Sequence, residues 1–125
     1  MLARLPSRIL GRFGEYQAIK YLISQGFCVR ASNFYTRWGE IDIVASNQQR
    51  IVFVEVKTRW QTTQGQAEEA FYPRKQQRLS RAIWRYLTQH KLQRYEWQLD
   101  LITVCVLPDF IFLRHWPAVG EDIRE

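Results

Sequence analysis

The chain has 125 residues, of which 46% are hydrophobic and 14% aromatic; this is enough for the core of one compact domain and too little for two. Lysine and arginine outnumber aspartate and glutamate by 18 to 12, so the net charge is +6. That charge favours an anionic partner, with nucleic acid as the leading candidate, and no apolar run is as long as a membrane span.

Cysteine, histidine and the N-terminal residues exclude several classes of protein. Cys28 and Cys105 are far apart and form no C-x-x-C pair, which argues against a disulfide framework. We expect both to be buried free thiols. His90 and His115 have no partner at the spacing of zinc ligands. The stretch MLARLPSRIL lacks the apolar region of a signal peptide, so we expect a cytoplasmic protein.

The first predicted element is a helix from Ser7, a plausible N-cap, to Gly26, a plausible stop. One of its faces should meet the core, and at helical spacing that face carries Gly11, Glu15, Ala18, Ile19 and Leu22. Glu15 is therefore a carboxylate within a stripe that is otherwise small or apolar.

Three strands should follow, because alternating apolar runs are bounded there by turn residues. They cover residues 26–35, 39–45 and 50–59, and SNQQ forms the turn between the second and the third. Residues 60–72 are rich in Gln, Thr and Gly without a clear period, which predicts a mobile loop with one helical turn.

A second long helix is predicted from Pro73 to about Lys91. Its apolar side consists of Leu79, Ile83, Tyr86 and Leu87. Two more strands, at 95–107 and 109–116, precede a polar tail. The order α-βββ-α-ββ predicts one α/β domain over residues 1–125, with a mixed sheet flanked by helices, a core from about 7 to 116 and flexible ends.

Acidic residues interrupt the second and third strands. Alternation should place Glu40, Asp42 and Val44 on one face of the second strand, opposite Ile41, Ile43 and Ala45. The third strand should place Phe53, Glu55, Lys57 and Arg59 opposite Val52, Val54 and Val56. Because an unpaired buried carboxylate is costly, the acids either meet solvent or converge on a cation such as Mg²⁺. Glu40 is either a further acid at that site or the edge of the strand.

One stretch of the chain resembles the PD-(D/E)xK phosphodiesterase motif, with Ile41 in the place of Pro. It consists of GEID, twelve intervening residues and then EVK. With GRFGEYQAIKYLISQGF, RWGEIDIVA, VFVEVKTR and KQQRLSRAIWRYL, the chain is similar to the YraN family of predicted endonucleases, relatives of archaeal Holliday junction resolvases. This resemblance extends roughly from Gly11 to Val104 and implies a restriction-endonuclease-like fold.

The resemblance also implies a catalytic set of Glu15, Asp42, Glu55 and Lys57. Asp42, Glu55 and the main-chain carbonyl of Val56 would ligate Mg²⁺ or Mn²⁺, with Glu15 bound directly or through water. Lys57 would hold or help deprotonate the attacking water. The implied activity is metal-dependent cleavage of DNA, including structured or branched DNA. Open alternatives are an inactive nucleic-acid-binding module that keeps the fold, a protein-interaction domain with an inert acidic pocket, and a simple ion pair on a solvated strand face.

Basic residues on the second predicted helix form a stripe opposite its apolar side. Arginine suits phosphate because its planar guanidinium presents a fork of donors. We expect DNA contacts from this stripe, its neighbour Lys75 and the third strand, namely from Arg59, Arg74, Lys75, Arg78, Arg81 and Arg85. A solvated helix face explains the same stripe.

Two interpretations remain open for each of three further residues. Trp38 and Trp60 flank the charged strands and could stack on unpaired bases or cap the core. Asp100, between Leu99 and Leu101, is more consistent with a structural than a catalytic role. The sequence is compatible with a homodimer that cuts both strands as well as with a single chain.

Overall fold

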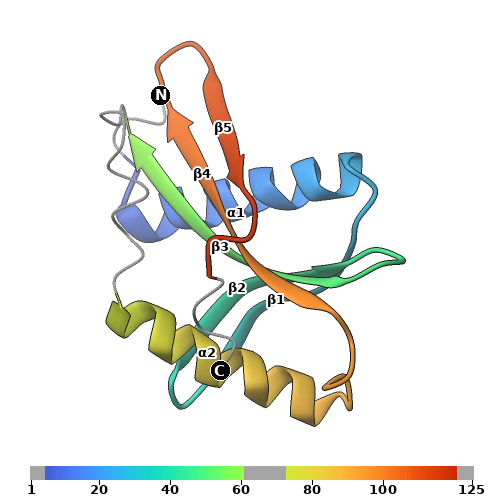
Figure 1. Ribbon diagram of the computed structural model, residues 1–125. Coiled ribbons are helices and arrows are strands. Elements are labelled where there is room, and N and C mark those ends of the chain that lie inside the picture. The colour runs from blue at the N-terminus through green and yellow to red at the C-terminus, as the bar shows by residue number, and fades with distance from the viewer. Residues whose placement is uncertain (1–4, 61–72, 121–125) are drawn as a thin grey trace.

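The computed structural model describes residues 5–60 and 73–120, with side chains described for 5–60 and 77–120. Its elements, labelled in Figure 1, are α1 (Ser7–Ser24), β1 (Cys28–Thr36), β2 (Gly39–Ser46), β3 (Ile51–Trp60), α2 (Pro73–Gln89), β4 (Trp97–Val106) and β5 (Ile111–Trp116). The predicted order α-βββ-α-ββ is confirmed.

The helix boundaries differ slightly from the prediction. Ser7 is the first helical residue, and Pro6 occupies the N-cap position without a side-chain cap. The helix α2 ends at Gln89, two residues before Lys91. The loop at 61–72 and the outermost terminal residues, which we expected to be flexible, lie outside the described residues.

The five strands form one mixed sheet in the order β1-β2-β3-β4-β5. Every neighbouring pair is antiparallel except β3 and β4, which are parallel and are connected through α2. In the β2–β3 turn, the Asn47 side chain accepts the N–H groups of Gln49 and Arg50 at 2.9 and 3.0 Å. This closes the hairpin that SNQQ predicted.

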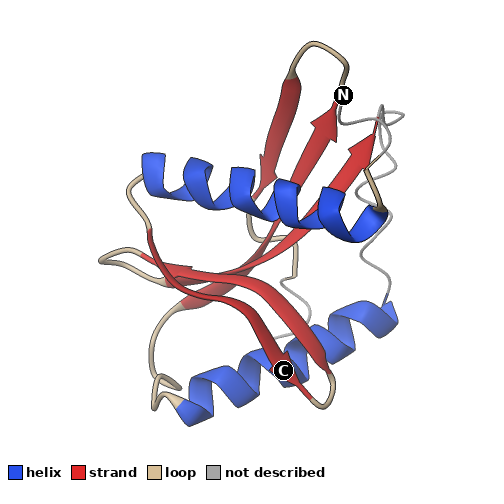
Figure 2. Cartoon of the chain, turned by 180° about the vertical axis from the view of Figure 1, so that it is seen from behind, coloured by secondary structure: helices blue, strands red, loops and turns tan. Residues whose placement is uncertain are grey.

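Helices cover both faces of the sheet, with α1 on one side and α2 on the other (Figures 1 and 2). The buried side of α2 contains the predicted Leu79, Ile83, Tyr86 and Leu87, together with Ala82. On β3, Ile51 and Phe53 pack toward α2, whereas Val52 and Val54 pack toward α1. The central strand is therefore buried on both faces, as strands of covered parallel sheets are.

The predicted division of β2 into two faces is correct for Val44, which lies opposite Ile43 and Ala45, but wrong for Ile41. Ile41 packs with Val44 in the cluster on the α2 side, whereas Ile43 belongs to the cluster on the α1 side. The change coincides with Asn33 of β1, which has φ of +53° and lies opposite Asp42, between the pairs Ser32–Ile43 and Phe34–Ile41. The pairing of β2 with β3 also ends at Ile43–Val54, so the regular alternation of a paired strand is lost at this point.

The helix α1 approaches β3 most closely at Gly14. A Cβ atom built on Gly14 would lie 1.8 Å from Thr58 Oγ1, so any larger residue there has to displace the Thr58 side chain. Within the described part of the chain, Thr58 Oγ1 is buried without a hydrogen-bond partner. The contact fixes the height of α1 above the sheet, and thereby the position of the next residue, Glu15.

The cysteines are not buried as expected. Cys28 is exposed and Cys105 is half-buried, and both are free thiols. Cys28 lies on the edge strand β1 and Cys105 on β4, next to the other edge. At such positions an apolar run in the sequence does not ensure that a side chain is buried. Neither α1 nor α2, the helices of the described segments, has the length and apolarity needed to cross a membrane.

We predict that Gly14→Ala destabilises the protein while Gly11→Ala does not. The added methyl group at position 14 must displace Thr58, and such overpacking costs about 1–3 kcal/mol. A Cβ on Gly11, in the same helix, meets nothing within 4 Å, so that variant should gain a few tenths to about 1 kcal/mol. Urea unfolding measures both.

Thr58→Ala in the Gly14→Ala background supplies the control, because it removes the nearest clashing atom. It should recover part of the lost free energy of unfolding. Equal effects of alanine at positions 11 and 14 would contradict the proposed close approach.

Candidate metal centre

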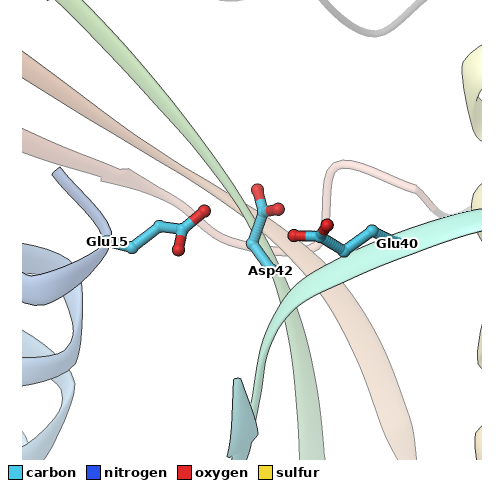
Figure 3. Close-up of side chains that lie close together, drawn as sticks. All are labelled: Glu15, Glu40 and Asp42. Carbon is cyan, nitrogen blue, oxygen red and sulfur yellow. The ribbon is translucent and has the colours of Figure 1, made fainter. Parts of the chain in front are cut away.

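Three carboxylates from two elements converge on one point beside the sheet. Glu15 comes from α1, and Glu40 and Asp42 come from β2; one oxygen of each lies within 4.8 Å of the others. Figure 3 shows the three side chains turned toward one another. All three residues are half-buried, so their charges are only partly screened by water.

A fork between β2 and β3 makes room for this cluster. The pairing of the two strands ends at Ile43–Val54, so Asp42 lies just beyond the paired region. Its Oδ2 accepts the N–H of Val56 at 2.8 Å. Asp42 thus takes over a main-chain donor that β2 no longer pairs, and the bond holds its carboxylate against β3.

Asn33 links the two glutamates. With its amide nitrogen toward the cluster, Asn33 donates to Glu15 Oε1 at 3.2 Å and to Glu40 Oε1 at 2.5 Å. Its left-handed backbone aims the side chain there, and asparagine tolerates that conformation better than most residues. Asn33 was not among the predicted site residues; its signal in the sequence is an asparagine in the middle of a strand, where asparagine is disfavoured.

Burial and like charges shift the acids toward their protonated forms. Burial, followed by the charge of Glu55, raises the pKa of Asp42 to about 8, although the N–H of Val56 acts in the opposite direction. Burial also raises the pKa of Glu15, and the charges of Glu40 and Glu55 add to this effect. Without a compensating cation, protonation is therefore what relieves the repulsion among these acids.

The other residues of the predicted catalytic set lie on β3. Glu55 is only 8% exposed, and its charge acts on both Asp42 and Glu15, but its carboxylate is not one of the three within 4.8 Å. Lys57 is half-buried two residues further along. The structure thus brings Glu15 and Asp42 together with Glu40, whose role the sequence had left open.

The predicted nucleic-acid contacts are distributed over α2 and the end of β3. Arg78, Arg81 and Arg85 are exposed on α2. Arg59 is half-buried on β3 and pairs with Cys105 of β4. Arg74 and Lys75 belong to α2, but their side chains lie outside the described part of the structure.

The two tryptophans differ in their surroundings. Trp60 is half-buried against the apolar cluster under α1, which matches the core-capping role rather than the stacking role. Trp38 lines an open cavity beside α2.

Asp100 has the structural environment that its sequence position indicated. It is 1% exposed, and its Oδ1 accepts bonds from Gln98 Nε2 at 2.8 Å and from Ala118 N at 2.9 Å. Its Oδ2 lies 2.6 Å from His115 Nε2, and the Tyr21 hydroxyl lies 2.8 Å from His115 Nδ1. Asp100 therefore ties β4 to β5 and α1 and satisfies its own buried oxygens.

The arrangement at Glu15, Glu40 and Asp42 can bind a metal ion. Carboxylate oxygens are the ligands that hard divalent cations prefer, and a bound cation would offset the repulsion that raises the pKa of Asp42.

We predict that, in the presence of a chelator, Asp42→Asn is more stable than wild type at pH 8.5. At pH 5 its advantage in free energy of unfolding should be much smaller. The folded pKa of Asp42, about 8, exceeds its ordinary value of 3.8. The stability that protonated Asp42 contributes is therefore complete below about pH 4 and is lost as pH rises toward 8. Asparagine does not titrate, so the gain at high pH should be on the order of a few kcal/mol.

Urea unfolding at the two pH values measures this difference. Asp109→Asn, at an exposed carboxylate in the β4–β5 turn, is the matched control and should show no such pH dependence. A loss of stability in Asp42→Asn that is equal at both pH values would show that the cluster is not under electrostatic repulsion.

Comparisons with known proteins place this geometry in a family. The model of the uncharacterised protein family UPF0102 matches residues 14–104, a segment that contains Glu15, Glu40, Asp42 and Glu55. A UPF0102 protein of Herpetosiphon aurantiacus is 35% identical over 117 residues, which are 90% of this chain and 94% of the relative. One from Syntrophomonas wolfei is 41% identical over 100 residues, with 80% and 87% covered.

Among solved structures, the chain is similar to Archaeoglobus fulgidus Hjc, described as a Holliday junction resolvase from an archaeal hyperthermophile. The TM-score is 0.45 at 19% identity, with 86% of this chain and 77% of that chain covered. The family model and the full-length relatives carry the assignment, and the chain belongs to the UPF0102 family.

Proposed function

We propose that this protein is a metal-dependent endonuclease that hydrolyses phosphodiester bonds in DNA, including structured or branched DNA. The observation that carries the proposal is the convergence of Glu15, Glu40 and Asp42 within 4.8 Å, beside Glu55 on the neighbouring strand. The resemblance of the Asp42, Glu55 and Lys57 pattern to a phosphodiesterase motif supports the same activity.

The carboxylates fit a small divalent cation. Each Mg–O bond is about 2.1 Å, so two ligands on opposite sides of Mg²⁺ are about 4.2 Å apart. Neighbouring ligands of an octahedral Mg²⁺ are about 3.0 Å apart. Because three oxygens cannot all be opposite one another, the three carboxylates, whose oxygens lie within 4.8 Å of one another, would move closer together on binding the ion. The proposed ligands are Asp42, Glu55 and the carbonyl of Val56, with Glu15 bound directly or through water. Glu40, whose carboxylate lies beside those of Glu15 and Asp42, is a further candidate ligand.

When bound, Mg²⁺ or Mn²⁺ would polarise the phosphate and lower the pKa of an attacking water. The chain's own residues would hold the ion's ligands and the attacking water in place. The N–H of Val56 fixes one oxygen of Asp42, which leaves the other oxygen to bind the metal ion. Asn33 holds Glu15 and Glu40 in place. Lys57 would orient the water and offset negative charge that develops on the phosphate.

The charge distribution suits a DNA substrate. The chain has a net charge of +6, and Arg78, Arg81 and Arg85 expose guanidinium groups on α2. Contacts of this kind neutralise phosphates and release counterions, so affinity for DNA should fall steeply with salt. Such contacts position a strand without reading its sequence.

We predict that the wild-type protein cuts DNA only with Mg²⁺ or Mn²⁺ and leaves 5′-phosphate ends. Asp42→Ala removes a central ligand, and its rate should fall at least about 10²- to 10³-fold, the loss typical for a preorganised electrostatic group. Lys57→Ala should slow cleavage while preserving DNA affinity. The assay uses supercoiled, single-stranded, flap and four-way-junction DNA, each with Mg²⁺, Mn²⁺ or chelator.

Asp109→Ala is the matched control and should cut like wild type, because its carboxylate is exposed in the β4–β5 turn. Cleavage that persists in Asp42→Ala would reveal a contaminating nuclease. Binding without cleavage by wild type on every substrate would support the alternative, an inactive nucleic-acid-binding module.

A further inference from the structure

A second site is formed where the tip of the β1–β2 hairpin meets α2. An open cavity of about 560 Å³ lies there, lined by Arg37, Trp38, Arg81, Trp84, Arg85 and Thr88. The first two residues come from the hairpin tip and the other four from the second half of α2. The cavity is separate from the acidic cluster, none of whose carboxylates lines it.

The lining has the chemistry of a nucleotide site. It combines two indole rings with three guanidinium groups, and none of the six residues is acidic. Aromatic rings stack on nucleobases, and guanidinium groups bind phosphate or stack on the same rings. A volume of about 560 Å³ lies in the range of about 300–1,000 Å³ that small-molecule sites occupy.

The hairpin side of the cavity is held in place by its own hydrogen bonds. Thr36 Oγ1 donates to the carbonyl of Gly39 at 2.7 Å and accepts the N–H of Trp38 at 3.1 Å. Gly39 has φ of +144°, a conformation that other residues rarely adopt. The guanidinium of Arg37 lies 5.0 Å from the centre of the Trp38 ring. Trp38 is thus presented by a preformed turn.

The side of the cavity formed by α2 is also held in place by packing. Trp84 packs edge-on against Trp97 of β4, with ring centres 6.4 Å apart, yet it remains 38% exposed. An aromatic side chain that is anchored at one end and open at the other can bind a planar group with little loss of conformational freedom. Arg81 and Arg85 are one helical turn apart on the same helix, so both can reach one bound phosphodiester segment.

The cavity lies next to the acidic cluster along the chain. Glu40 follows Trp38 by two residues, a span of about 7 Å at most. Because a stacked nucleic acid strand advances about 3.4 Å per nucleotide, a segment of a few nucleotides could extend from the cavity to the acids. One strand could then place a base in the cavity and a phosphate at the acids.

We propose that this cavity binds an unpaired nucleotide of the DNA substrate, with the base against Trp38 and Trp84 and the phosphates on Arg37, Arg81 and Arg85. The inference rests on the proposed endonuclease function and names its substrate class, DNA with a single-stranded segment. A base inside a duplex is stacked and paired, so it could enter only after leaving the helix.

The test measures binding in chelator, where no cleavage occurs. Three labelled DNAs are titrated by fluorescence anisotropy: a thymidine oligonucleotide, a duplex with a single-stranded thymidine arm, and a blunt duplex. Trp38→Ala and Arg85→Glu should each weaken binding of the first two DNAs, the former by roughly 5- to 150-fold for one lost base stack. Trp38→Ala should leave the blunt duplex unchanged. Trp38→Phe, which keeps a stacking ring, should retain most of the affinity.

Phe112→Ala is the matched aromatic control, because Phe112 is 52% exposed on β5 at the opposite edge of the sheet. Its affinities should equal those of wild type. Circular dichroism and thermal unfolding establish that each variant is folded. Asp42→Asn should keep the preference for single-stranded segments, so a failure of cleavage and a failure of this site give different results.

Wild-type affinity of both Trp38→Ala and Arg85→Glu for all three DNAs would overturn the proposal and leave the endonuclease proposal standing. Tighter binding of a uridine oligoribonucleotide than of its DNA counterpart would also overturn it, because the occupant would then be RNA.

Discussion

Mutual repulsion among half-buried carboxylates is what the residues around the acidic cluster have to overcome. Glu15, Glu40 and Asp42 approach within 4.8 Å, and the charge of Glu55 reaches the same place. In water such groups would separate, since nothing favours their approach. The fold holds them together at a cost in stability. A bound cation would remove this repulsion, and the free energy regained would contribute to its binding affinity.

Several local features resist that repulsion, and each is an exception to ordinary secondary structure. The left-handed residue Asn33 brings an amide between two glutamates, and the fork of β2 and β3 frees the N–H of Val56 for Asp42. Gly14 lets α1 approach Thr58 closely enough to deliver Glu15. Departures from local regularity that gather at one place are typical of functional sites.

Much of the fold follows from periodicity, but the details of the site do not. The face of α2 with Leu79 and Ile83 was predictable because apolar residues recur at helical spacing, and the strands of β3 and β4 were predictable as apolar runs between turns. The side on which Ile41 packs was not, because β2 parts from β3 just beyond Ile43 and regular alternation is lost there. The nearness of Glu40 to Glu15, and the exposure of Cys28, depend on tertiary contacts that no local pattern records.

Whether these carboxylates hold a divalent cation is answered most directly by anomalous diffraction from crystals grown with Mn²⁺. The structure predicts one strong peak between Glu15, Glu40 and Asp42, with carboxylate oxygens at about 2.1–2.2 Å, near the bond lengths of Mg²⁺. It also predicts loss of that peak in Asp42→Asn crystals grown in the same way. A map without a peak at this position, or a peak that survives in Asp42→Asn, would contradict the assignment of these acids to a metal site.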